Sequence, residues 1–366
     1  MSEKDGTIRD RIDPLGDRLG AAFSTFEGPH TFGNSPQFWS AFLLVIAFAA
    51  IYPLVTNSYA LLQTTGLLVW VFLSLSLTLI WGYAGIFSFG QTAFFGLGGY
   101  TFGVVGINLV DITGATTVAL IAAVVVPALF AALLGYFMFY GRISGVYVAI
   151  ITLAVTLILA LLFSRTAGSE FAIGDAQLGG YNGMTGIPSI QLGGGPLVVE
   201  LGPSGMYYFI LILLVGGYLL ARYVLQSDYG YIMIGIREAQ ERTEMFGYDI
   251  RRVKLQVFTV AGGIAGLSGA LYASVGWFIS PPVMGLAFAA LPVIWVTVGG
   301  REALLGAILG TLGLRALEND LAASGSEFAT LFLGGLLMIA VLVIPDGVIP
   351  TALRLWNKYT ERGVGE

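Results

Sequence analysis

Residues 59–100 read YALLQTTGLLVWVFLSLSLTLIWGYAGIFSFGQTAFFGLGGY, and this stretch decides the class of fold. From Tyr59 to Trp81 no residue carries a charge. A helix of about 20 apolar residues, rising about 1.5 Å each, crosses the ~30 Å hydrocarbon core of a bilayer. The Gly-rich residues 82–99 that follow predict a broken or re-entrant helix, because irregular backbone at membrane depth is tolerated where it is buried or lines a wet cavity. The alternative is that these glycines only allow helices to cross closely.

The rest of the chain shares this apolar character. It is 56% hydrophobic and only 11% charged, whereas soluble domains contain roughly 25% charged residues. We therefore predict an all-α polytopic membrane protein with about ten transmembrane helices. The predicted spans are 38–57, 59–81, 93–109, 116–139, 146–163, 206–225, 255–275, 286–298, 303–317 and 328–344. The absence of Cys excludes disulfides, so helix packing through the 51 Gly residues must hold the bundle.

The charges are distributed asymmetrically between the predicted loops. With the N-terminus inside, only Arg165 and Arg315 of the 17 Lys and Arg lie outside. Such an excess of basic residues on one side favours a protein of the cell membrane with both termini cytoplasmic. The predicted organisation is a cytoplasmic tail 1–37, a transmembrane domain 38–344 with an outer loop 164–205 and an inner loop 226–254, and a cytoplasmic tail 345–366. We expect no cleaved signal peptide, and no basic face indicates a nucleic-acid partner.

The predicted spans contain little that could power or catalyse a reaction. Arg222, near the inner end of the span 206–225, is counted on the cytoplasmic side, which leaves Arg315 as the ionisable residue in the body of the spans. We interpret Arg315 and Glu318, at i and i+3, as a neutralising pair, with a substrate contact as the alternative. No lysine follows a nucleotide-binding Gly motif, and the single His30 lies in a tail. We therefore expect no catalytic residue, no metal site and no cofactor on this chain.

The segment 231–254, YIMIGIREAQERTEMFGYDIRRVK, is too charged to enter lipid. Its apolar residues predict a short helix with one side against the protein, and the alternative is a solvated loop. These residues are Ile232, Ile234, Ile236, Met245 and Phe246. Glu241 and Gly247 have the E-x-x-x-x-x-G spacing of the loop by which permeases of ABC importers dock their ATPase. Arg242 and Thr243 stand where that motif has two alanines, so the match is partial.

Several blocks in order resemble the permease subunits of the branched-chain amino acid and urea ABC importers. They are residues 82–100, 181–188 (YNGMTGIP), 236–254, 265–272 (AGLSGALY) and 298–310 (VGGREALLGAILG). The blocks GYDIRRVKL at 247–255 and PVIWVTVGGR at 292–301 lean towards the urea permeases, and uncharged spans suit urea; branched-chain amino acids are the alternative. Gln91 stands where many relatives have His, which removes a group that could protonate.

This resemblance implies a transport subunit rather than an enzyme. The expected partners are a second homologous permease, two ABC ATPases that bind ATP and Mg, and an extracytoplasmic solute-binding protein. The expected sites are a substrate path at Ser88, Gln91, Thr92 and Trp295, a binding-protein face at Asn182 and Thr185, and an ATPase-docking surface at Arg237, Glu241, Phe246 and Gly247. A channel or secondary carrier that needs no ATPase is the more distant alternative.

Overall fold

The computed structural model describes residues 26–28, 33, 35–113, 116–194, 197–323, 334–335, 347–348 and 351. Within these residues the fold is a bundle of apolar helices. The helices are α2 (Pro36–Val55), α3 (Ser58–Leu77), η2 (Thr78–Tyr83), α4 (Gln91–Thr113), α5 (Thr117–Tyr140), α6 (Val146–Ser164), α7 (Pro203–Gln226), α8 (Asp228–Met245), α9 (Ile250–Gly276), α10 (Leu286–Gly299) and α11 (Leu304–Ala323). The prediction of an all-α polytopic fold is confirmed.

Polar side chains set the start of several helices. Ser35 and Asn57 accept hydrogen bonds from Phe38 N and Ala60 N, at 3.2 and 2.8 Å, and so begin α2 and α3. Asp249 accepts one from Arg252 N at 3.2 Å and begins α9. These side chains satisfy backbone donors that the first turn of a helix leaves unpaired.

Seven of the described helices are long and apolar enough to cross a membrane. The pair α10 and α11 passes the same test only together, and it bends by 118° between Gly299 and Leu304. The described part of the chain therefore holds seven candidate spans, or eight if the bent pair counts as a single span. This is fewer than the ten spans that we expected. The tenth predicted span, 328–344, lies outside the described residues.

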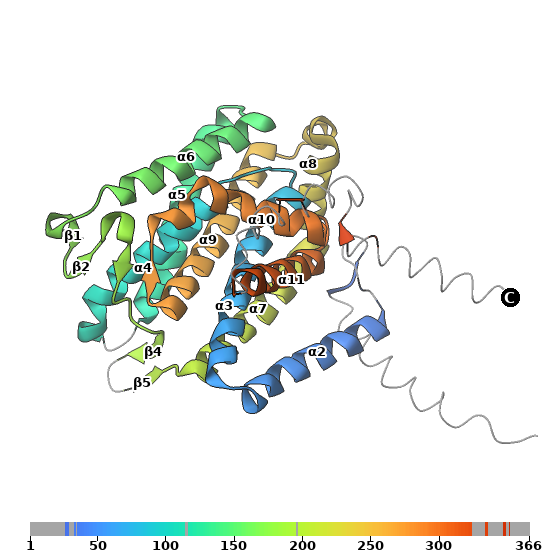
Figure 1. Ribbon diagram of the computed structural model, residues 1–366. Helices are drawn as coiled ribbons and strands as arrows, with labels where there is room; N and C mark the ends of the chain where they lie inside the picture. The colour runs from blue at the N-terminus through green and yellow to red at the C-terminus, as the bar shows by residue number, and fades with distance from the viewer. Residues whose placement is uncertain are drawn as a thin grey trace, which may run out of the picture.

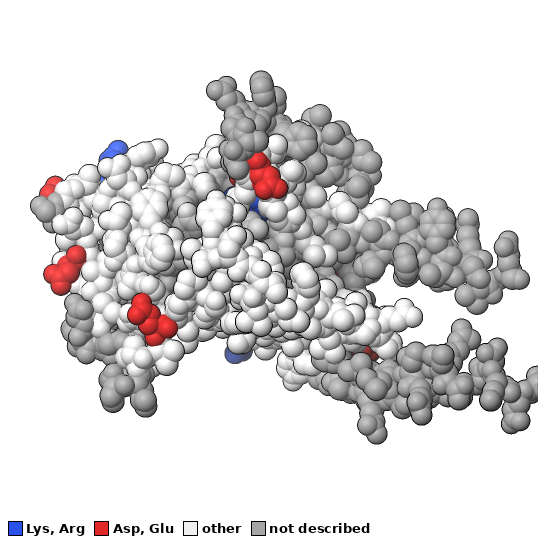
Figure 2. Space-filling view, turned by 60° about the horizontal axis from the view of Figure 1, so that its bottom comes forward, with Lys and Arg blue, Asp and Glu red and all other residues white. Residues whose placement is uncertain are grey.

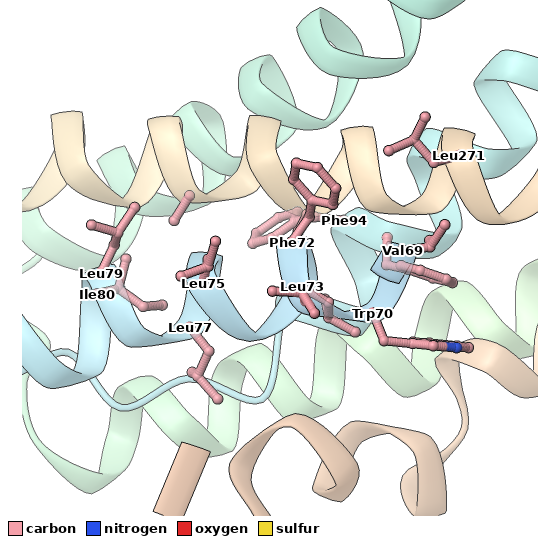
Figure 3. Packing of buried hydrophobic residues seen from close by; sticks show 14 of the residues in the cluster. Val69, Trp70, Phe72, Leu73, Leu75, Leu77, Leu79, Ile80, Phe94 and Leu271 are labelled. Carbon is pink, nitrogen blue, oxygen red and sulfur yellow. The ribbon is translucent and has the colours of Figure 1, made fainter. Parts of the chain in front are cut away.

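The helix α3 with η2, and the helix α9, form the centre of the bundle. The best apolar windows of these two segments are 78% and 72% buried, whereas the window of α2 is 6% buried. Side chains of α3 and η2 pack beside α9 and α4. Leu271 of α9 and Phe94 of α4 belong to the same buried cluster (Figure 3). The outer helices α2, α5 and α6 expose large apolar side chains such as Leu44, Phe137 and Leu161.

These apolar surfaces are what a lipid-facing bundle requires. On the face drawn in Figure 2, charged side chains form a few separate patches and uncharged atoms cover most of the described surface.

Glycines let α9 approach its neighbours closely. A Cβ at Gly269 would overlap the carbonyl oxygen of Phe95 on α4, and one at Gly266 would overlap Pro127 and the carbonyl oxygen of Ala123 on α5. Close backbone approach of this kind stabilises helix pairs in lipid, where the hydrophobic effect does not drive them together. The expectation that many glycines serve packing is confirmed at these positions.

The predicted break after Trp81 is present but shorter than expected. Thr78–Tyr83 is a π-helical turn, residues 84–90 are irregular, and α4 begins at Gln91. Gly85 has φ of +70°, a conformation that favours glycine. The residues 91–99 are therefore helical, and the irregular segment is confined to 84–90.

Arg222 corrects the sequence interpretation, because it lies within α7 and its side chain is fully buried. Its guanidinium donates to the carbonyl oxygens of Phe26 and Gly33 at 2.9 and 3.2 Å, and lies 4.8 Å from the ring centroid of Trp39. Its position near the inner end of a predicted span suggested that it lies at the cytoplasmic surface. The residues before α2 fold back onto α7 and supply the partners that bury this cation.

Two opposite ends of the bundle carry the loops (Figure 1). One, here called the α8 end, contains α8 and the irregular residues 84–90 and 300–303. The other, here called the strand end, contains three antiparallel two-stranded sheets. They pair β1 (Ala172–Ile173) with β2 (Ala176–Gln177), β3 (Met184–Thr185) with β6 (Phe278–Ile279), and β4 (Gln191–Gly194) with β5 (Leu197–Glu200).

Candidate functional site

The helix α8 is divided by a kink at Ala239, whose φ and ψ are −154° and 78°. Before the kink, Met233, Ile234 and Ile236 are buried against the bundle. After it, the last turn projects away, and Met245 and Phe246 are 85% and 81% exposed. The expectation that these two residues lie against the protein is therefore wrong, because the kink redirects the helix before it reaches them.

The exposed tip of α8 gathers the predicted docking residues. Glu241, Phe246 and Gly247 are all exposed there. Gly247 has φ of +89°, which ends the helix, and no described atom lies within 4 Å of where its Cβ would be. A cavity of about 240 Å³ adjoins the tip, with Arg142, Glu244 and Lys254 in its wall. The tip thus presents the apolar Met245 and Phe246 among exposed charged residues, beside a cavity with charged residues in its wall.

Side chains tie α8 to the start of α9. The Tyr229 hydroxyl donates to the carbonyl oxygen of Val253 at 3.3 Å and lies 3.2 Å from Gln256 Oε1. Burial raises the pKa of Tyr229 to about 12, so the hydroxyl keeps its proton at neutral pH. Lys254 Nζ donates to Gln240 Oε1 at 2.6 Å, just after the kink.

Arg237 connects α8 to the interior of the bundle. Its guanidinium donates to the carbonyl oxygen of Gly82 and to Glu238 Oε1, and Nη1 lies 3.6 Å from Glu302 Oε1. The Tyr83 hydroxyl donates to the carbonyl oxygen of Glu302 at 3.1 Å. One side chain of α8 therefore contacts both the broken segment after α3 and the bend between α10 and α11. Of the four predicted docking residues, Arg237 alone faces inward.

The predicted path residues of the broken segment are buried in this conformation. Ser88, Gln91 and Thr92 are each 1% exposed. Ser88 Oγ accepts a hydrogen bond from Gly90 N at 3.0 Å, and Ser76 Oγ donates to Gln91 Oε1 at 2.9 Å. Gln91 Nε2 and Thr92 Oγ1 have no hydrogen-bond partner among the described residues. Buried polar atoms are usually paired, so this small polar cluster has capacity for a further ligand or water.

Trp295, the fourth path candidate, belongs to a different cluster. It is 1% exposed, and its ring lies 5.8 Å from that of Trp70 and 5.7 Å from the Arg315 guanidinium carbon. The structure therefore does not place Trp295 with Gln91. Trp70 and Ser76 are six residues apart on α3, about 9 Å along its axis, so the two clusters lie at different depths.

Trp70 was not among the predicted path residues, although its neighbours Trp295 and Arg315 were singled out from the sequence, as a path residue and as a possible substrate contact. Nothing in the residue spacing marks an aromatic residue inside an apolar run as a binding residue. Arg315 was the available signal, since an ionisable residue at membrane depth points to its neighbours. The predicted ion pair with Glu318 is present, with Nη1 and Oε2 2.6 Å apart.

Asn182 and Thr185, the predicted binding-protein face, are exposed at the strand end. Asn182 ends a short 3-10 turn, and Thr185 lies in β3 opposite Phe278 of β6. The buried Met184 and Ile187 anchor this loop to the bundle. The two exposed side chains thus stand on a fixed loop.

These features define a polytopic α-helical membrane protein, with a projecting helix tip at one end and a structured loop at the other. The chain belongs to the family described as branched-chain amino acid transport system, permease component, whose profile matches residues 59–342. This match agrees with the resemblance of the sequence blocks to permease subunits of this family.

Curated relatives agree with the family. The chain is 27% identical to the high-affinity branched-chain amino acid transport system permease protein LivM of Escherichia coli, over 84% of this chain and 73% of that protein. It is 30% identical to the autoinducer 2 import system permease protein LsrC of Salmonella paratyphi B, over 43% of this chain and 46% of that protein. No solved structure matches the chain.

Proposed function

We propose that this chain is a permease subunit of an ATP-driven importer and that it carries branched-chain amino acids. A relative that aligns with 84% of the chain is named for branched-chain amino acid transport, and the matching family carries the same description. The prediction of urea as the substrate receives no such support, so branched-chain amino acids, the alternative substrate, are the better proposal.

The observation that carries the ATP-driven mechanism is the connection made by Arg237. The exposed tip with Phe246 is free to enter a groove of an ATPase, and Arg237 joins the same helix to Gly82 and Glu302. A displacement of α8 by the ATPase would therefore pull on both helix breaks at once. Breaks in spans are the positions at which transporters bend between their inward and outward forms.

The partners follow from this mechanism as proposals. Two ABC ATPases bind ATP and Mg and hold the α8 tip through Glu241, Phe246 and Gly247. A second permease completes the path, and an extracytoplasmic binding protein rests on the loop with Asn182 and Thr185. In this arrangement the α8 end faces the cytoplasm and the strand end faces outward, which keeps the predicted orientation with both termini inside.

The test of substrate is uptake by the complete complex, assembled with the proposed partner subunits. In the presence of the binding protein and ATP, radiolabelled leucine, isoleucine and valine should accumulate, and urea should neither accumulate nor compete. Accumulation of urea without accumulation of leucine would overturn the proposed substrate.

A further inference from the structure

A cavity of about 340 Å³ opens between α3, the end of α9 and α11. Its wall includes Gln63, Trp70, Tyr272, Phe278, Arg315 and Asn319. The cavity lies towards the strand end, because Phe278 pairs there with Thr185 of the structured loop. Pockets for small ligands measure about 300–1,000 Å³, so this volume suits a small substrate.

Arg315 is the charged residue in this wall. Its side chain is 15% exposed, and its guanidinium carbon lies 4.6 Å from the Trp70 ring centroid. Glu318 accepts one hydrogen bond from Nη1 at 2.6 Å, whereas the buried Nε has no partner among the described residues. A guanidinium carries five N–H donors, so Arg315 retains capacity for an anion. An incompletely paired cation at membrane depth is expensive and points to function.

The rest of the wall complements a different part of a ligand. Trp70, Tyr272 and Phe278 present aromatic surface. Gln63 and Asn319 present amide oxygens that can accept hydrogen bonds from an ammonium group. Because Glu318 already balances the charge of Arg315, a ligand without net charge leaves the site neutral, whereas a simple anion or cation would leave one buried charge uncompensated.

We infer that this cavity is a transient binding site for a zwitterionic amino acid, with its carboxylate on Arg315, its ammonium at the oxygens of Gln63 and Asn319, and its apolar side chain against Trp70, Tyr272 and Phe278. The inference rests on the proposed function and names the residues that hold its substrate. The cavity would then be the first binding site on the substrate path, towards the strand end, where the binding protein is proposed to bind.

The inner polar cluster of Ser76 and Gln91 follows about 9 Å further along α3. Urea needs only hydrogen bonds, so a site built on an ion pair favours an amino acid over urea. A leucine that leaves the cavity towards the α8 end would therefore meet uncharged polar groups next.

The test uses the complete complex with its partner subunits in proteoliposomes. Arg315→Met combined with Glu318→Gln removes both members of the pair, so no buried charge is left alone and the bundle should assemble. Replacement of both members of a buried pair is often neutral for folding. We expect ATP-driven leucine uptake to fall at least tenfold while the ATPase subunits still co-purify at wild-type ratio. Arg165→Met, which removes an exposed arginine at the end of α6, is the matched control and should keep wild-type uptake.

The outcomes separate the two proposals. If the wild-type complex takes up leucine and the double variant does so at the wild-type rate and KM, the pair is only structural and the inference fails, although the proposed function stands. If the wild-type complex takes up no branched-chain amino acid, the proposed function itself fails. As a second variant, Trp70→Leu keeps the ion pair and removes aromatic wall, and it should raise the KM for leucine by about tenfold; an unchanged KM would also count against the inference.

Discussion

The guanidinium of Arg237 donates a hydrogen bond to the backbone carbonyl of Gly82, which lies 155 residues earlier in the chain. This bond joins the helix that projects from the bundle to the break in the most buried of the described spans. A hydrogen bond from a charged donor contributes about 1.5–3 kcal/mol. In the proposed mechanism this contact transmits a displacement of α8 to the break.

Arg237→Met is expected to uncouple the transporter. Methionine keeps much of the aliphatic volume but makes no bond to Gly82 or Glu302, so movement of α8 should no longer reach the breaks. ATP-driven uptake should fall about tenfold or more, as a loss of about 1.4 kcal/mol or more implies, while ATP hydrolysis by the complex continues. Glu238→Gln is the control, since Glu238 is mostly exposed and exposed pairs contribute little. Equal losses of uptake in both variants would contradict a specific role of the Gly82 bond.

Phe246→Glu is expected to block docking of the ATPase. The side chain is 81% exposed, so its replacement leaves the packing of this chain intact but places a charge where an apolar contact is proposed. The measurement is the amount of ATPase that co-purifies with the permease. Gly247 is less suitable for a test by substitution, because its φ of +89° would strain the backbone of any other residue.

Phe171→Glu is the matched control for Phe246→Glu. Phe171 is a 43% exposed phenylalanine at the strand end, where no ATPase is proposed to bind. Its variant should retain the full complement of ATPase. Retention by the Phe246 variant as well would show that the tip of α8 is not the docking surface.

The sequence predicted the class of fold because the signal is repeated in every span. Long uncharged runs, such as residues 59–81, can bury their backbone polar groups only as helices in lipid. The break after Trp81 was also predicted from its glycines, but its length was not. Once Gln91 begins α4, the next glycines meet α9 and its neighbours and do not interrupt the helix, which depends on contacts that composition does not reveal.

The candidate sites were less accessible to sequence reasoning. The exposure of Phe246 depends on a kink at Ala239, a residue with no propensity to break a helix. The burial of Arg222 depends on residues before α2 that fold back over it. Trp70 approaches Arg315 from a helix more than 200 residues earlier, so only the packed bundle shows that they face one cavity.

Gly269→Ala is expected to destabilise the bundle. The new methyl group would overlap the carbonyl oxygen of Phe95, so α4 and α9 must separate. Overpacking of a tight core costs about 1–3 kcal/mol, which thermal unfolding of the purified protein in detergent should reveal as a lower Tm. Gly216→Ala in α7 is the matched control, because no described atom lies within 4 Å of its Cβ position. It should leave the Tm unchanged or raise it slightly. The account of glycine packing fails if both variants melt alike.

Arg222→Met is expected to release the residues that precede α2. The variant removes the hydrogen bonds to Phe26 and Gly33 and the contact with the Trp39 ring. A loss of about 2–4 kcal/mol in the free energy of unfolding follows from the loss of buried, charge-assisted hydrogen bonds. Limited proteolysis should then cleave near residue 30 faster than in the wild type. Arg242→Met, which removes an exposed arginine in the last turn of α8, should not alter the cleavage rate. Equal cleavage of wild type and the Arg222 variant would refute the anchoring role.

The most direct measurement of the central claim is leucine accumulation in proteoliposomes that contain either this chain alone or the complete complex with its second permease, ATPases and binding protein. The account predicts that leucine accumulates against a gradient only in the complete complex and only with hydrolysable ATP. Leucine flux through the chain alone, without ATP or partners, would contradict it and would favour a channel or secondary carrier.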